Sequence, residues 1–108
     1  MDLRTETTCW GAHGAVVTTG GDLDSASANQ LRDTLHDLIE AGRTNLVIDM
    51  RFLELYDSVG LAVLAVAARK CAEHGGWLRV VNADPVIAAA LDVAGLGTVV
   101  DTAPVQTR

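Results

Sequence analysis

The chain has 108 residues, of which 49% are hydrophobic and only 4% aromatic, and its formal net charge is −6. This acidic balance argues against nucleic acid as a partner, because phosphate binding needs clustered Lys and Arg. No apolar run approaches the roughly 20 residues that span a bilayer, and the N-terminus lacks an apolar signal core. We therefore expect one aliphatic-cored domain over residues 1–108, without membrane insertion and located in the cytoplasm.

Two short extended segments are predicted at the start of the chain, over residues 3–10 and 14–19, with a hairpin turn between them. Gly20 and Gly21 follow, and a glycine pair before an apolar stripe indicates a bend that leads into a helix. A phosphate-binding P-loop is the alternative, but no Lys-Ser or Lys-Thr follows at the required distance.

The next predicted helix begins at a cap formed by Asp24 or Ser25 and ends at Gly42. Its apolar residues recur at helical spacing, which predicts one buried face. Residues 46–50 form a nearly continuous apolar run that is typical of a strand covered on both sides. Residues 51–56 are expected to form a loop.

The second half of the chain repeats this alternation. Residues 60–74 predict a largely buried helix, residues 77–81 a strand, and Asp84-Pro85 the start of a third helix. That helix is expected to end near Gly95 and Gly97, with a last strand at residues 99–100. The order β-β-α-β-α-β-α-β predicts an α/β domain whose sheet has parallel neighbours, followed by a loose tail at residues 103–108.

Most enzymatic and metal-binding patterns are missing from the sequence. A serine hydrolase needs Gly-x-Ser-x-Gly, and Tyr56 stands where the first glycine before Ser58 would be. Dinucleotide binding needs Gly-x-Gly-x-x-Gly, which is absent. Metal-ligand spacing is also lacking, since the two cysteines and three histidines are far apart: Cys9, Cys71, His13, His36 and His74.

Asp22 and Asp24 could form a carboxylate pair for acid–base chemistry, although helix capping is the more common use of such residues. A second polar break occurs at Asp57-Ser58, between the apolar strand and the long helix. The residues alone leave two alternatives for it, a simple helix cap or a modification site. A phosphate on Ser58 would add about −1.5 to −2 charges beside Asp57 and expel a docked partner.

Two stretches together resemble a known family. Gly21-Asp22-Leu23-Asp24 resembles the Gly-Glu-Leu-Asp element of bacterial anti-sigma factor antagonists, and Asp57-Ser58-Val59-Gly60-Leu61 resembles their Asp-Ser-Ser/Thr-Gly-Leu element. The resemblance covers residues 12–101 and points to the sulphate-transporter and anti-sigma-antagonist (STAS) domain. It implies a mixed sheet of four to five strands with helices packed mainly on one face.

The resemblance also implies a function in partner switching and no enzymatic activity, cofactor or metal. The unmodified antagonist binds an anti-sigma factor, which is a serine kinase, and so frees a sigma factor. The kinase phosphorylates the residue matching Ser58, and a serine/threonine phosphatase restores binding. The implied docking surface comprises Asp22, Asp24, Asp57, Ser58, Val59 and Gly60.

Three features depart from the family pattern. Val59 replaces a common second hydroxyl, Tyr56 replaces an aliphatic residue, and the final helix is missing or very short. The alternative function is therefore a STAS scaffold without a phosphoswitch, or a subunit of a membrane transport system. A small enzyme or nucleotide-binding protein ranks last.

Overall fold

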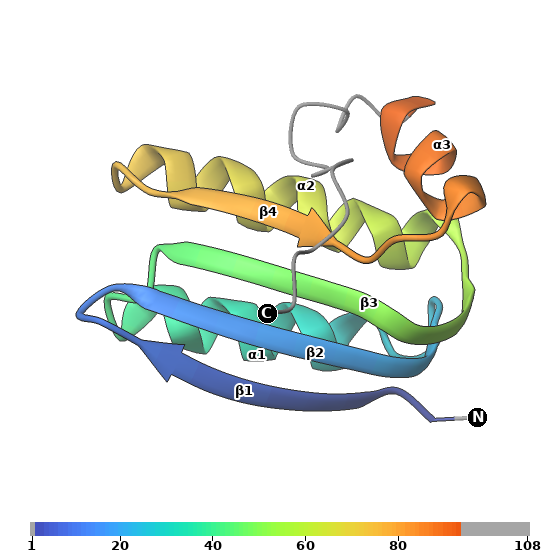
Figure 1. Ribbon diagram of the computed structural model, residues 1–108, viewed down its shortest axis with the longest axis horizontal. Helices are drawn as coiled ribbons and strands as arrows, with labels where there is room; N and C mark the ends of the chain where they lie inside the picture. The colour runs from blue at the N-terminus through green and yellow to red at the C-terminus, as the bar shows by residue number, and fades with distance from the viewer. Residues whose placement is uncertain (1, 94–108) are drawn as a thin grey trace, which may run out of the picture.

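The computed structural model describes residues 2–93, which form a four-stranded mixed sheet and three helices (Figure 1). The strands lie in the sheet in chain order. The first pair is antiparallel and joined by a tight turn, whereas the other two pairs are parallel and joined through helices. The strands are β1 (Arg4–Trp10), β2 (Gly14–Leu23), β3 (Asn45–Tyr56) and β4 (Trp77–Val81).

The three helices are α1 (Ala28–Glu40), α2 (Ser58–Glu73) and α3 (Pro85–Val93). Helices α1 and α2 lie side by side against one face of the sheet, and α3 lies beyond β4 near the start of α2 (Figure 1). This arrangement confirms the predicted α/β class, the mixed sheet and the helices packed mainly on one face.

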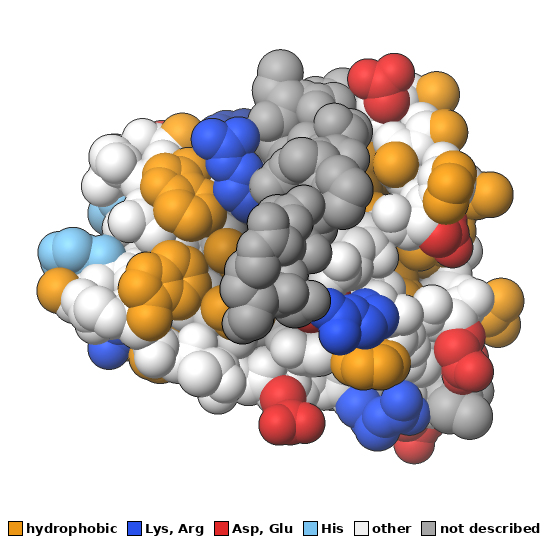
Figure 2. Space-filling view, in the orientation of Figure 1, with side chains coloured by type: hydrophobic (Ala, Val, Ile, Leu, Met, Phe, Trp, Pro, Cys, Tyr) orange, Lys and Arg blue, Asp and Glu red, His pale blue; other side chains and the backbone are white. Residues whose placement is uncertain are grey.

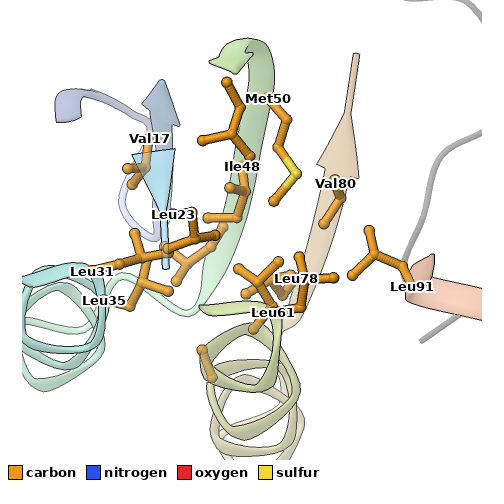
Figure 3. Packing of buried hydrophobic residues seen from close by; sticks show 14 of the residues in the cluster. Val17, Leu23, Leu31, Leu35, Ile48, Met50, Leu61, Leu78, Val80 and Leu91 are labelled. Carbon is orange, nitrogen blue, oxygen red and sulfur yellow. The ribbon is translucent and has the colours of Figure 1, made fainter. Parts of the chain in front are cut away.

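The core fills the space between the sheet and the helices, and it is aliphatic as the composition predicts. Alternate residues of β2 and β3 point toward α1 and α2, and Leu91 reaches the same core from α3 (Figure 3). Complete burial of aliphatic side chains from every layer supplies the main favourable term in folding. The largest fully buried side chains are Val17, Leu23, Leu31, Leu35, Leu46, Ile48, Met50, Leu64, Val80, Leu91, Thr19 and Cys71.

The opposite face of the sheet has a different composition. Figure 2 views this face, on which apolar, basic and acidic side chains are mixed. Trp10 and Trp77 meet there, with ring centroids 6.4 Å apart. They come from the two edge strands, β1 and β4. Gly14 of β2 is the register partner of Trp10, and it has to be glycine because the Trp10 indole occupies the space that a side chain at this position would take.

Two expectations about the strands are wrong. Residues 51–56 form no loop, because β3 continues through them and pairs with β2 as far as Leu23 and Tyr56. Gly20 and Gly21 form no bend, because they belong to β2 at two register shifts in that pairing. Gly21 has φ +84°, and the backbone of Asp2 occupies the space of its missing side chain.

The helix boundaries also differ from the sequence prediction. Helix α1 begins later than expected, at Ala28, because a turn over residues 24–27 precedes it. Helix α2 begins earlier, at Ser58, and buries one face only, so that Val66 on its outer side is 42% exposed. The strand over residues 77–81 and the start of α3 are confirmed. The expected strand at residues 99–100, the glycines after α3 and the tail lie outside the described residues.

Candidate functional site

The site lies where β2 and β3 end next to each other. Leu23 and Tyr56 are register partners at the carboxyl ends of these parallel strands. The Asp57 N–H donates a hydrogen bond of 3.0 Å to the Leu23 carbonyl, which extends the pairing by one residue. The parallel topology therefore brings together the two motifs that are separated by more than 30 residues in the sequence.

Asp57 is the N-cap of α2. Its backbone is extended, with φ −136° and ψ 176°, and its Oδ1 accepts a hydrogen bond of 2.8 Å from the Gly60 N–H. The Leu61 N–H donates to the Asp57 carbonyl at 3.1 Å. An N-cap carboxylate both satisfies a free backbone donor and complements the positive end of the helix. The capping alternative considered for this motif is thus realised by Asp57.

Ser58 is consequently free to serve another purpose. It is the first residue of α2 and is exposed, and its hydroxyl takes no part in the cap. Val59 beside it is also exposed, at 52%. An enzyme or a docking protein can therefore reach both side chains from solvent.

Gly60 lies on the inner side of the same turn and is buried. A Cβ atom at this position would lie 2.6 Å from the Leu23 carbonyl oxygen and 2.7 Å from Leu23 Cγ. The absent side chain thus lets the start of α2 pack directly on the end of β2. Gly60 defines how close Ser58 lies to the turn that follows β2.

The turn after β2 is organised by Asp24. Its Oδ1 accepts hydrogen bonds from the Ala26 N–H at 3.0 Å and the Ser27 N–H at 3.1 Å. The Ser27 hydroxyl donates to the carbonyl of Asp22 at 2.8 Å. Asp22 itself is in β2 and partly exposed. The two carboxylates therefore face different surroundings, and Asp24 stabilises the turn that precedes α1. The expectation that Asp24 or Ser25 caps this helix is wrong, because Ser27 is the N-cap residue and no side chain forms a cap hydrogen bond there.

A single side chain joins this turn to the start of α2. The Ser25 N–H donates a hydrogen bond of 3.1 Å to Asp57 Oδ2, while Oδ1 of the same carboxylate caps Gly60. Ser25 and Ser27 were not among the predicted site residues. The link through Ser25 uses a backbone donor, which any residue except proline provides, so the sequence carries no signal for it.

An apolar hollow of about 530 Å³ borders Ser58 between α2 and α3. The side chains that the two helices direct toward each other here are mostly alanines, which are too small to fill the space between them. Tyr56 and Leu61 form part of the wall of the hollow. The Tyr56 hydroxyl lies 3.5 Å from the Val86 carbonyl oxygen. The hollow is continuous with the exposed start of α2, so apolar surface and a modifiable hydroxyl lie side by side.

Metal-ligating and thiol groups are dispersed in the described part of the chain. Within residues 2–93, no three His, Cys, Asp or Glu side chains gather closely enough to hold a metal ion. Cys9 is exposed and Cys71 is buried, both as free thiols, and burial raises the pKa of the Cys71 thiol to about 11. None of the helices in this range is long and apolar enough to cross a membrane.

The comparisons with known proteins extend the resemblance seen in the sequence. A family model described as "Mlab, STAS domain" matches residues 7–101. The anti-sigma-F factor antagonist RsfB of Mycobacterium tuberculosis is 36% identical over 56 residues, which are 52% of this chain and 46% of RsfB. The alignment thus spans about half the length of this curated relative.

Solved structures agree in fold. The anti-sigma factor antagonist SpoIIAA in its unphosphorylated form superposes with a TM-score of 0.82 at 20% identity, covering 94% of this chain and 90% of SpoIIAA. An anti-sigma factor antagonist from Mycobacterium paratuberculosis has a TM-score of 0.81 at 24% identity, covering 94% and 87%. Because the family model spans most of the sequence and these folds coincide with it, the chain belongs to the STAS domain family.

Proposed function

We propose that this protein is an anti-sigma factor antagonist that docks through the surface around Ser58. Membership of the STAS family supports this function, as does the partial similarity to a relative named as such an antagonist. The observation that carries the proposal is the exposed Ser58 at the first residue of α2, with Asp57 supplying the cap in its place. The proposed surface comprises Asp22, Asp24, Asp57, Ser58 and Val59, while Gly60 permits their close packing.

The proposed switch is phosphorylation of Ser58. A serine kinase transfers the γ-phosphoryl group of ATP to the Ser58 oxygen, the hydroxyl proton leaves, and ADP is released. The product carries roughly two negative charges. Because Asp57 already occupies the Gly60 N–H, the phosphate has to remain on the outer surface, where it repels acidic groups and blocks an apolar contact at Val59. A serine/threonine phosphatase reverses the step by hydrolysis.

The partner in this proposal is an anti-sigma factor that is itself the kinase. Such a protein has to bind the hydroxyl form and release the phosphorylated form. The exposed Val59 and the apolar hollow supply contact area that is independent of charge. The change in affinity then comes from the buried charge, since desolvating an unpaired dianion in an interface is costly.

The test begins with recombinant anti-sigma factor kinases of the source organism and ATP, followed by mapping of phosphate by mass spectrometry. Phosphate is expected on Ser58. Ser25→Ala is the matched control, because Ser25 is the other exposed serine of the site and its hydroxyl forms no hydrogen bond in the described structure. Ser58→Ala should retain binding and Ser58→Asp should weaken it.

Two results would contradict the proposal: phosphate found only on other residues, or equal affinity of the Ser58→Ala and Ser58→Asp variants for the anti-sigma factor. A STAS scaffold or transport subunit without a phosphoswitch predicts this equality. Binding to transport proteins instead of anti-sigma factors would decide for that alternative.

A further inference from the structure

We infer that Asp57 is a positioning residue, whose carboxylate locks the Asp24–Ser27 turn to the start of α2 and so fixes the shape of the surface around Ser58. The two carboxylate oxygens face in different directions. Oδ1 accepts from Gly60 within α2, whereas Oδ2 accepts from Ser25 in the neighbouring turn. Only the consequence for docking rests on the proposed function; the lock itself is a property of the isolated protein.

The hydrogen bond between Ser25 and Asp57 is the sole hydrogen bond that the described structure shows between residues 24–27 and residues 57–61. The other hydrogen bonds of the turn run within it, back to β2 or forward into α1, including those to Asp24 Oδ1, to the Asp22 carbonyl and from the Ala28 N–H to the Asp24 carbonyl. Without the Asp57 side-chain contact, residues 24–27 have no hydrogen bond to the start of α2, and the nearest remaining one joins the Asp57 N–H to the Leu23 carbonyl at the base of the turn. The sequence motif therefore contains a carboxylate whose role is internal.

Asparagine at position 57 separates the two functions of this carboxylate. Its single carbonyl oxygen can still cap Gly60, and asparagine is as good an N-cap as aspartate. Its second polar atom is an amide nitrogen, which can only donate. It therefore faces the Ser25 N–H donor to donor, and Asp57→Asn removes the link while leaving the start of α2 intact.

Asp24→Asn is a matched control in the same turn. Both bonds that Asp24 receives from backbone donors use its Oδ1, which the amide of asparagine also supplies. This variant loses the same unit charge from the same surface but keeps the Ser25–Asp57 bond. A difference between the two variants then reports the bond and not the charge.

The experiment is amide hydrogen exchange on the isolated protein, read at Ser25 and Gly60. A charge-assisted hydrogen bond corresponds to roughly a tenfold or larger change in local opening. Asp57→Asn should accelerate exchange of Ser25 about tenfold and leave Gly60 protected, and Asp24→Asn should leave both protected. Unchanged exchange at Ser25 in Asp57→Asn would overturn the inference.

A double-mutant cycle tests the effect on docking. Ser25→Pro deletes the donor of the same bond, and proline is well tolerated at the second position of a tight turn. If Asp57 acts through this bond, Asp57→Asn and Ser25→Pro should each weaken binding to the anti-sigma factor by a similar factor. The double variant should then bind no more weakly than either single variant. Additive losses would show that Asp57 acts on the partner by another route and would overturn the positioning role.

The two hypotheses fail in different ways. If no anti-sigma factor binds the wild-type protein, the proposed function is wrong, and the exchange rate of Ser25 still decides whether Asp57 forms the lock. If binding occurs but Ser25 exchanges equally in wild type and Asp57→Asn, the lock is wrong and the proposed function stands.

Discussion

Gly60→Ala should destabilise the protein even though it places a better helix former inside a helix. Gly60 lies in the first turn of α2, and even the full helix-interior value of a glycine-to-alanine replacement is only about 1 kcal/mol in propensity. The new Cβ, however, would lie 2.6 Å from the Leu23 carbonyl oxygen and 2.7 Å from Leu23 Cγ. Overpacking of this kind costs roughly 1 to 3 kcal/mol, and a backbone oxygen in a strand cannot rotate away.

The upper part of that range applies because both the main chain and the side chain of Leu23 are contacted. We therefore expect a net loss of about 2 kcal/mol in the free energy of unfolding, measured by urea denaturation with linear extrapolation. Ser58→Ala is the control in the same turn, and its exposed position predicts a change within about 0.5 kcal/mol. A Gly60→Ala protein as stable as wild type would refute the packing argument.

Two further predictions concern the buried face of α2. Leu64→Ala should lower the free energy of unfolding by about 2 to 5 kcal/mol, because Leu64 is fully buried, whereas Val66→Ala in the same helix should have little effect, because Val66 is 42% exposed; equal denaturation midpoints would contradict this. Cys71 makes stability depend on alkaline pH: burial raises its pKa from the ordinary value of 9.0 to about 11 in the folded state, so its contribution is complete below pH 9 and is lost as pH rises toward 11, by up to about 3 kcal/mol. Cys71→Ala should remove this part of the slope in denaturation curves recorded from pH 8 to 11, and an unchanged slope would exclude the thiol as its source.

Hydrophobic periodicity was sufficient to predict the class and order of the elements. The apolar stripe of α1 predicts a helix with one buried face, and the alternation of buried and exposed residues in β4 is typical of a strand. Asp84-Pro85 is typical of the start of a helix. Periodicity failed where pairing requires irregularity. Between Asp49 and Tyr56, β3 contains two more residues than its partner β2, so both Phe52 and Leu55 face solvent and the alternation is lost.

Asp49 shows how the structure accommodates that irregularity. Its Oδ1 accepts hydrogen bonds from the Arg51 N–H at 2.9 Å and from the Asn82 side chain at 3.0 Å. Asp49 lies in β3 at the last pairing with β4. From the sequence alone, it is only a charged residue near the end of an apolar run. Such a bulge depends on contacts from a distant strand and therefore has no local signature.

The candidate site divides in the same way. Ser58 and Asp57 were identifiable because a motif fixes their spacing, and the structure places both at the start of α2. The Ser25 contact depends on a backbone donor, and the hollow beside Ser58 depends on how α3 packs against α2. Neither a main-chain hydrogen bond nor an interhelical distance can be deduced from residue types alone.

The proposed switch has to act at contact distance, and the charge of the protein explains why. The chain already carries a formal net charge of −6, so a phosphate of roughly −2 changes its long-range field by only about a third. At physiological ionic strength that field decays over about 8 Å. A partner that approaches the unmodified and phosphorylated forms thus meets similar long-range fields. At the start of α2, by contrast, a neutral hydroxyl becomes a dianion next to Asp57 and the exposed Val59. Added salt should therefore alter the affinities of both forms while preserving most of the difference between them.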